Sequence, residues 1–491
     1  MADQDAFIDA FARFLDKVVH DHERATSSDA GELVRLLDAH LGSPAVECSI
    51  VTERLPPWRL VDADAVLDAL AGAQGRVVGL SVDRRQRDVG LRSILAGRHG
   101  PVGVAPIDHI SMPVGPGEER RVVSRGLRLL TWGGEPVAVL QSAADPEWDR
   151  EQATLEVVGA SAETVDAFLA EVRRRMTADS VLRGQVMTFR PHGFESMLGG
   201  VAFVERPSVA REDVVLPDGA FERLEQHVLA LGAHREALLA AGQHLKRGVL
   251  LYGPPGTGKT HTVRHLVGAA EGATVLMLSG NSLGAVRDAA SIARVLEPAI
   301  VVLEDCDLIA EDRDMMGSPD SLLFELLEAL DGLDGDADVA FLLTTNRPDL
   351  LEQALAQRPG RIDLAVEVPR PDAAARRRLF ALYARGLDLG DEAVGAAADR
   401  AEGVTASFAK ELVRRTVLAA AVEGVPAADR HLEAALDELL GDRESFTRSL
   451  LASGPSMHEG RPRGSRGRSH HGVGEEWIDE DGNGHVVLGG D

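Results

Sequence analysis

Residues 253–260 read Gly253-Pro254-Pro255-Gly256-Thr257-Gly258-Lys259-Thr260, and this stretch decides the fold. It matches G-x-x-x-x-G-K-[ST], a loop that binds the phosphates of a nucleotide. The apolar run 248–252 before it predicts a buried strand, and residues 261–267 after it predict a helix. In that setting the glycines let backbone N–H groups turn inward around a triphosphate, and the N-terminus of the helix adds a partial positive charge.

The side chains of this loop predict contacts with ATP and Mg2+. We expect Lys259 to contact the β- and γ-phosphates and the Thr260 hydroxyl to hold Mg2+. An ordinary glycine turn would not require a lysine, and the whole chain has only four lysines. The predicted nucleotide-binding residues are Gly253, Pro254, Pro255, Gly256, Thr257, Gly258, Lys259, Thr260 and His261.

Composition narrows the class of protein. A chain of 491 residues is expected to hold two or three domains, and its net charge of -26 disfavours nucleic acid as a partner. No apolar run approaches the length of a membrane span, so we expect no membrane association. The acidic N-terminus predicts no export, and two cysteines cannot make a disulfide framework. These features together predict a cytoplasmic protein.

The pattern along the chain predicts four parts. Residues 1–205 begin with helical spacing and continue as a mixed α+β pattern without a catalytic constellation, so we expect a domain that binds a partner or shapes an oligomer. Residues 206–370 predict a large α/β nucleotide-binding domain, and residues 371–445 predict a small helical domain. Residues 446–491 have few apolar anchors and predict a disordered tail.

Strands and helices alternate regularly through the nucleotide-binding part, which predicts a five-stranded parallel sheet wrapped by helices. The third expected strand ends in Glu304-Asp305, and the fourth ends in Asn346. Ligands bind such sheets at the carboxyl ends of the strands. The five expected strands are residues 248–252, 274–278, 299–305, 339–346 and 364–368.

Four segments together resemble the AAA family of ATPases, within the wider AAA+ superfamily. They are residues 253–260, 301–307, 344–348 and 358–363. The resemblance extends over about residues 214–440 and implies a P-loop core, an ATP-hydrolysing activity and a small helical lid. Within the lid, residues 403–407 resemble the family's segment near the adenine.

The resemblance also implies roles for single residues. Glu304 would contact Mg2+ through water, Asp305 would polarise the attacking water, and Asn346 would take the sensor-1 role. Arg358 and Arg361 resemble paired arginine fingers that enter the site of a neighbouring subunit. A site completed by a neighbour implies a ring, which in this family is a hexamer.

The sequence departs from the family's pattern at the carboxylates that follow the third strand. Most members read Asp-Glu, whereas this chain reads Glu304-Asp305-Cys306-Asp307. Asp305, the second carboxylate, is shorter than the usual glutamate and reaches less far. In an alternative assignment, Asp305 contacts the metal and Asp307 is the base. The same Glu-Asp order occurs in the mitochondrial translocase that exports the folded Rieske protein.

Two further departures concern the pore and the fingers. Residues 279–285 read Ser-Gly-Asn-Ser-Leu-Gly-Ala, with no aromatic side chain to grip an extended polypeptide. Leu283 alone would be a weak grip, which disfavours threading of unfolded chains. Ala356-Gln357 place an apparent extra residue before Arg358 and shift the expected register of the fingers.

The sequence therefore predicts an ATP-hydrolysing ring that remodels or translocates an unknown protein partner. Two other functions stay open at this point. One is a nucleotide-switched oligomeric scaffold with incidental turnover. The other, disfavoured by the acidic balance, is a nucleic-acid motor.

Overall fold

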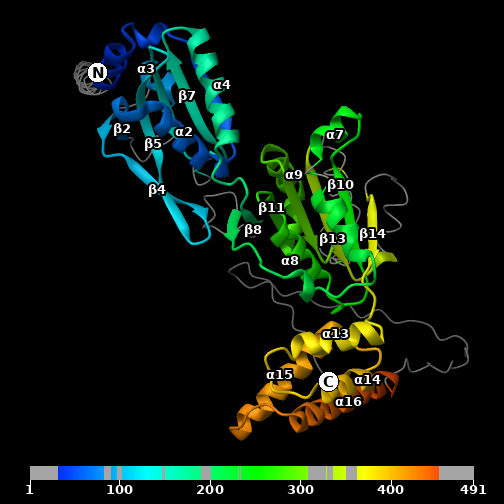
Figure 1. The fold of residues 1–491 in the computed structure, drawn as a ribbon. Coiled ribbons are helices and arrows are strands. Elements are labelled where there is room, and N and C mark those ends of the chain that lie inside the picture. Colours follow the sequence, from blue (N-terminus) through cyan, green and yellow to red (C-terminus); the bar gives the residue numbers. More distant parts are fainter. Residues whose placement is uncertain are drawn as a thin grey trace, which may run out of the picture. The chain divides into compact units, whose positions relative to one another are not determined.

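The computed structural model describes residues 31–81, 90–96, 102–145, 150–189, 201–230, 232, 234–307, 328, 336–349 and 362–452. These residues form an antiparallel sheet, a second and mostly parallel sheet, and a C-terminal set of helices (Figure 1). Two predictions fall partly outside this range, the helical start before residue 31 and the tail after residue 452.

The first sheet has seven strands in the order β1-β7-β6-β5-β2-β3, with β4 paired to β5, and every pairing is antiparallel. Helices cover both of its faces. On β6, Val137 and Val139 pack toward α2 and α4, whereas Ala138 and Leu140 pack toward the helical residues 31–41 and α3. The elements are β1 (Ile50–Leu55), α2 (Leu60–Ala71), β2 (Arg76–Ser81), α3 (Leu91–Ala96), β3 (Gly103–Ala105), β4 (Asp108–Gly115), β5 (Glu118–Trp132), β6 (Glu135–Ser142), β7 (Ala153–Gly159) and α4 (Ala162–Ala178).

The second sheet contains the five strands expected from the sequence, adjacent and parallel, and two more. The additional strands β8 and β9 come before residue 206, and β8 pairs with β11 in parallel while β9 pairs with β8 in the antiparallel sense. This sheet therefore begins before the boundary that the sequence predicts at residues 205 and 206. The strand order is β14-β10-β13-β12-β11-β8-β9, with β8 (Val186–Phe189), β9 (Val201–Val204), β10 (Arg247–Tyr252), β11 (Thr274–Ser279), β12 (Ala299–Glu304), β13 (Val339–Thr345) and β14 (Leu364–Glu367).

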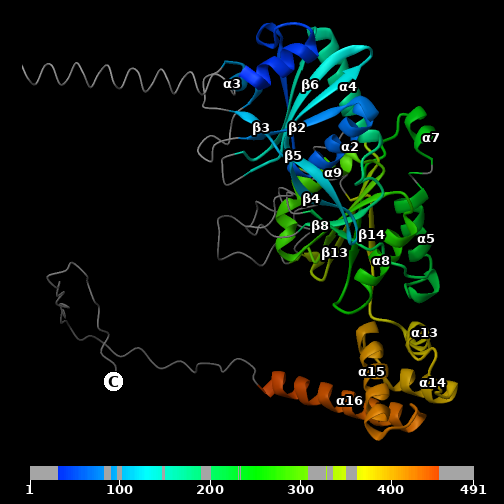
Figure 2. The same cartoon turned by 90° about the vertical axis from the view of Figure 1, so that its left-hand side faces the viewer.

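Both faces of the second sheet are buried by helices (Figure 2). Along β13, Phe341 and Leu343 pack on the face covered by α9, and Ala340 and Leu342 pack on the face covered by α5 and α8. Continuous apolar strands are typical of a parallel sheet covered on both sides. The helices around this sheet are α5 (Ala220–Glu225), the π-helix η6 (Gln226–Ala230), α7 (Arg235–Ala240), α8 (Lys259–Ala269) and α9 (Val286–Val295).

The C-terminal helices follow β14 and match the helical pattern of the sequence. Asp372 caps the first of them, because its carboxylate accepts a hydrogen bond from the Ala375 N–H at 2.8 Å. Residues 437–491 form a separate unit, of which the structure describes the part up to Ala452. Among the described residues, no helix has the length and apolar character needed to cross a membrane. The helices are α13 (Ala373–Tyr383), α14 (Asp391–Arg400), α15 (Ala406–Glu423) and α16 (Asp429–Ala452).

A buried carboxyl ties α2 to the segment that leads from the first sheet to the second. Asp62 is 1% exposed and accepts hydrogen bonds from the Ser180 hydroxyl at 2.8 Å and from the Val181 N–H at 3.0 Å. Burial raises the pKa of Asp62 to about 6, although both hydrogen bonds and the nearby Arg59 oppose the rise. The carboxyl is therefore protonated more readily in the folded protein than in the unfolded chain.

This raised pKa predicts a pH-dependent stability. The contribution of Asp62 is fully present below its unfolded-state pKa near 4 and is lost as pH rises through about 6. Asp62→Asn removes this titration, so the stability of the variant relative to wild type is expected to improve by about 2 to 3 kcal/mol between pH 4 and pH 7. Urea unfolding of both proteins at several pH values measures the difference. A pH-independent difference would contradict the assignment to Asp62.

Candidate functional site

The loop between β10 and α8 has a backbone that requires glycine. Gly253, Gly256 and Gly258 have φ values of 144°, 76° and 113°. A Cβ added to Gly253 would lie 2.3 Å from the carbonyl oxygen of Val368. Val368 cannot move away easily, because its N–H donates to the carbonyl of Tyr252 at 2.7 Å. The glycines are thus needed both for backbone conformation and for close packing.

Lys259 joins this loop to the end of β13. Its ammonium donates to the carbonyls of Gly253 and Pro254 at 2.8 and 2.9 Å, and to the Asn346 side-chain oxygen at 2.8 Å. Burial lowers the pKa of Lys259, and the neighbouring Asp305 carboxylate partly opposes this. The sequence separates Lys259 and Asn346 by 87 residues, and the fold brings them into direct contact.

Glu304, the last residue of β12, lies beside Thr260 at the start of α8. The Thr260 hydroxyl hydrogen-bonds the Glu304 carboxylate, whose Oε1 is buried and has no hydrogen-bond partner among the described residues. Burial raises the pKa of Glu304, and the adjacent Asp305 charge adds to the rise. A hydroxyl and a carboxylate with an open oxygen suit Mg2+, which takes few protein ligands and keeps waters and phosphate oxygens. The residues therefore fit the predicted metal.

Asp305 occupies a strained backbone conformation. Its φ is 54°, in the left-handed region that is uncommon for a residue with a side chain. The end of β13 holds it there, because Thr344 accepts from the Asp305 N–H through Oγ1 at 3.0 Å and from the Cys306 N–H through its carbonyl at 2.9 Å. The strain costs on the order of 1 to 3 kcal/mol and turns the Asp305 carboxylate toward Asn346, whose Nδ2 lies 3.4 Å away.

Asp307 differs from Asp305 in that its carboxylate is buried and well supplied with donors. It accepts from the Thr345 hydroxyl at 3.1 Å, from the Asn346 N–H at 3.0 Å and from the Asn346 Nδ2 at 3.4 Å. Burial alone would raise the pKa of Asp307, but the hydrogen bonds from Asn346 and Thr345 outweigh burial and hold the pKa below its usual range. This carboxylate anchors the end of β13.

Two contacts at the margin of the loop complete the site. The His261 side chain hydrogen-bonds the backbone of Asp213. Burial lowers the pKa of His261, and the contact with Asp213 opposes this decrease. Near the start of α15, the N–H and Oγ of Ser407 both donate to the Gly256 carbonyl, at 3.1 and 3.3 Å. Ser407 belongs to the segment 403–407, which the family resemblance places near the adenine. No local sequence pattern predicts its hydrogen bond to the loop.

Residues 249–370 match the family model described as "ATPase family associated with various cellular activities (AAA)". The chain carries an ATPase domain of the AAA family. The glycine-rich loop, the carboxylates at and after the end of β12, and Asn346 all lie within the matched residues.

Three relatives illustrate how much of the chain is similar to known proteins. The 26S protease regulatory subunit 6A of Caenorhabditis elegans is 33% identical over 40% of this chain and 49% of its own length. The proteasome-activating nucleotidase of Methanocaldococcus jannaschii is 34% identical over 38% of this chain and 46% of its own length. The ATP-dependent zinc metalloprotease FtsH 1 of Conexibacter woesei is 34% identical over 45% of this chain and 36% of its own length. The chain thus matches less than half of each relative.

Several predicted features of the AAA domain lie outside the described residues. They are Arg358 and Arg361 and the extra residue at Ala356-Gln357. The structure therefore brings together Lys259, Thr260 and the carboxylate and amide groups of the site, while the arginine fingers stay a prediction.

Leu283, in the segment 279–285 that was expected to face a pore, is part of the core. Residues 280–285 form a 3-10 helix (η7) that is closed by a capping box between Ser279 and Ser282. Leu283 is only 2% exposed and packs in the core beneath α9. Since it belongs to the core, Leu283 does not supply even the weak grip that the sequence left open.

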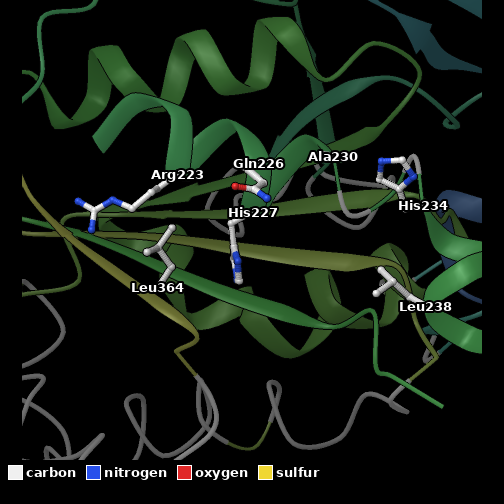
Figure 3. A pocket seen from close by; sticks show the side chains of 7 residues that line it. All are labelled: Arg223, Gln226, His227, Ala230, His234, Leu238 and Leu364. Atoms are coloured by element: carbon white, nitrogen blue, oxygen red, sulfur yellow. The ribbon is translucent and has the colours of Figure 1, made fainter. Parts of the chain in front are cut away.

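A pocket of about 470 Å³ lies away from the loop, beside the edge strand β14 (Figure 3). Leu364 and the side chains of Arg223, His227 and His234 line it. The His227 ring lies 3.9 Å from the Asp363 carboxylate, which also accepts from the Gly248 N–H at 2.9 Å. The pocket shares no lining residue with the nucleotide loop, so volume alone does not identify the site.

The packing of the loop predicts the effect of a single methyl group. Gly253→Ala places a Cβ against the Val368 carbonyl and strains a φ of 144°, so nucleotide affinity is expected to fall by at least about tenfold. Titration with a fluorescent ATP analogue measures this. Gly395→Ala in α14 is the matched control, because its added Cβ meets no atom of the described part of the chain within 4 Å. Equal affinity of Gly253→Ala and wild type would contradict the role of the loop.

Proposed function

We propose that this chain is a Mg2+-dependent ATPase that assembles into a ring and uses hydrolysis to remodel or translocate a protein partner. The observation that carries the ATPase part is the convergence of Lys259, Glu304, Asp305 and Asn346 around one glycine-rich loop. Each of these groups has a use in transfer of a γ-phosphate to water, which needs phosphate binding, metal binding and an oriented nucleophile.

Thr260 and Glu304 are the residues that would hold Mg2+, Glu304 through water. When bound, the metal neutralises charge on the β- and γ-phosphate oxygens. Lys259 would bind the same phosphates, exchanging one of its protein acceptors for a phosphate oxygen. Asn346 would orient the γ-phosphate or the attacking water through its amide, which already lies at hydrogen-bond distance from Lys259.

Asp305 is the carboxylate that would orient and deprotonate the attacking water. Its position next to Asn346 supports this role, and its side chain is only partly buried. Asp307 is less suited, because its oxygens accept three hydrogen bonds from Thr345 and Asn346. The short Asp305 side chain is consistent with slow turnover, since a misplacement of about 1 Å can cost on the order of 10^2-fold in rate.

A ring follows from the proposed arginine fingers. Arg358 and Arg361 would enter the site of the next subunit and stabilise the charge that develops on the transferred phosphoryl group, an effect of on the order of 10^3-fold or more. A hexamer is the ring size that the resemblance implies, and the composition favours the cytoplasm as its place of action.

A protein partner is supported by the names of the relatives, two of which are regulators or activators of a protease or proteasome. Burial of Leu283 and the absence of aromatic residues in 279–285 favour handling of a folded partner over threading. Recognition of that partner is assigned to residues 1–205, in which the described strands β1 to β7 form the first sheet, covered by helices on both faces, and β8 and β9 belong to the second sheet.

Mixing of two inactive variants tests the shared site. Lys259→Ala and the double variant Arg358→Ala/Arg361→Ala are each expected to lose at least about 10^2-fold in ATP turnover. When the two are mixed in equal amounts and reassembled, about one quarter of the interfaces combine an intact lysine with intact fingers, so roughly a quarter of the turnover should return. Phosphate release measures the recovery.

Two controls interpret the mixture. Each variant mixed with itself should stay inactive, and light scattering with ATP should give the same particle size for all samples. Full activity of Lys259→Ala would exclude an ATPase at this site. If the particle size changes with nucleotide but neither variant changes the rate of ATP turnover, a nucleotide-switched scaffold is favoured instead.

A further inference from the structure

Asp307 and Asn346 form a unit at the end of β13. The Asp307 carboxylate, 8% exposed, accepts from both the backbone N–H and the side-chain amide of Asn346. It also accepts from the Thr345 hydroxyl, which in turn accepts from the Arg347 N–H at 3.0 Å. One carboxylate therefore fixes the backbone and the side chain of the same asparagine.

This arrangement determines which way the Asn346 amide points. A carboxylate can only accept hydrogen bonds and a lysine ammonium can only donate them. The NH2 group of Asn346 consequently faces Asp305 and Asp307, each at 3.4 Å, and its oxygen faces Lys259 at 2.8 Å. Rotation of the amide by 180° would put oxygen against two carboxylates and NH2 against an ammonium.

Resting on the proposed function, we infer that Asp307 is a positioning residue for hydrolysis: it holds the Asn346 amide in the orientation in which the amide oxygen faces Lys259. Among the described residues, Asp307 makes no hydrogen bond to the nucleotide loop or to Lys259, and its hydrogen-bonded connection to Lys259 runs through Asn346. Its negative charge also acts on Lys259 directly, because it raises the pKa of that ammonium against the effect of burial. Asp307 differs from Asp305, which accepts from the Asn346 Nδ2 at the same distance, in that only Asp307 of the two also accepts from the Asn346 backbone N–H.

Asp307→Asn tests this inference because it keeps the size of the side chain and replaces one accepting oxygen with a donor. The Asn346 amide then keeps its contacts with Asp305 and Lys259 but loses the second acceptor of its NH2 group. The kcat for ATP is expected to fall by at least about tenfold while KM changes by less than about threefold, since the orientation matters most in the transition state. Steady-state phosphate release in the full-length ring measures both constants.

A double-mutant cycle tests whether Asp307 acts through Asn346. Asn346→Ala removes the amide, so adding Asp307→Asn to it should change kcat by no more than about twofold. If the two losses multiply instead, Asp307 has an effect of its own and the inference is overturned. If Asp307→Asn fails to fold, Asp307→Glu, which keeps a displaced carboxylate, takes its place in the same cycle with the same criterion.

Asp338→Asn is the matched control for general destabilisation. Asp338 is a buried aspartate at the opposite end of β13, 3% exposed and paired with Arg247 at 2.7 Å. This variant should lower the melting temperature and leave kcat within about twofold of wild type. An equal loss of kcat in Asp338→Asn and Asp307→Asn would overturn the inference. If wild type hydrolyses ATP and Asp307→Asn has the same kcat, the inference about Asp307 is overturned and the proposed ATPase stands. If wild type itself shows no ATP turnover, the proposed ATPase is overturned.

Discussion

The site depends on the register in which β13 pairs with its two neighbours. Tyr252 of β10 lies opposite Thr345, and Leu303 of β12 lies opposite Leu343. This register brings the glycine-rich loop, the carboxylates after β12 and Asn346 to the same edge of the sheet. A shift by one residue would exchange the two faces of β13 and move its buried apolar side chains toward the wrong helices. The same packing that builds the core thus aligns the polar groups.

The polar groups at that edge compensate one another. Lys259 is a buried cation on the helix that follows β10, whereas Glu304 ends β12 and Asp305 and Asp307 come after it. Asn346 follows β13, the strand between β10 and β12. Burial of a single charge would be costly, but here most buried polar atoms have partners. The orphaned Glu304 Oε1 is an exception, and it lies where the metal would bind. The strained backbone of Asp305 lies directly after Glu304, so both unfavourable features occur at the same edge of the sheet.

Much of the second sheet could be predicted from local pattern, because residues 299–305 and 339–346 are long apolar runs that end in polar groups. The strands β8 and β9 could not be predicted in this way, because each has only four residues. β8 forms by pairing with β11, which is distant in sequence, and β9 forms by pairing with β8. The first sheet was expected only as a mixed α+β pattern. Its strand order depends on pairings between residues far apart, such as Ile50 with Val158.

The sequence by itself determined the glycine-rich loop and the identity of its lysine, because the conformations of Gly253 to Gly258 and the chemistry of Lys259 are properties of consecutive residues. It also indicated which strand ends would carry carboxylates and an amide. Only the tertiary structure decided how Asp305 and Asp307 differ: Thr344 and Thr345 reach them from another strand, and so one aspartate is held in a strained turn while the other is saturated with hydrogen bonds. Burial and hydrogen-bond partners arise from contacts between distant segments, and these contacts set the role of a charged side chain.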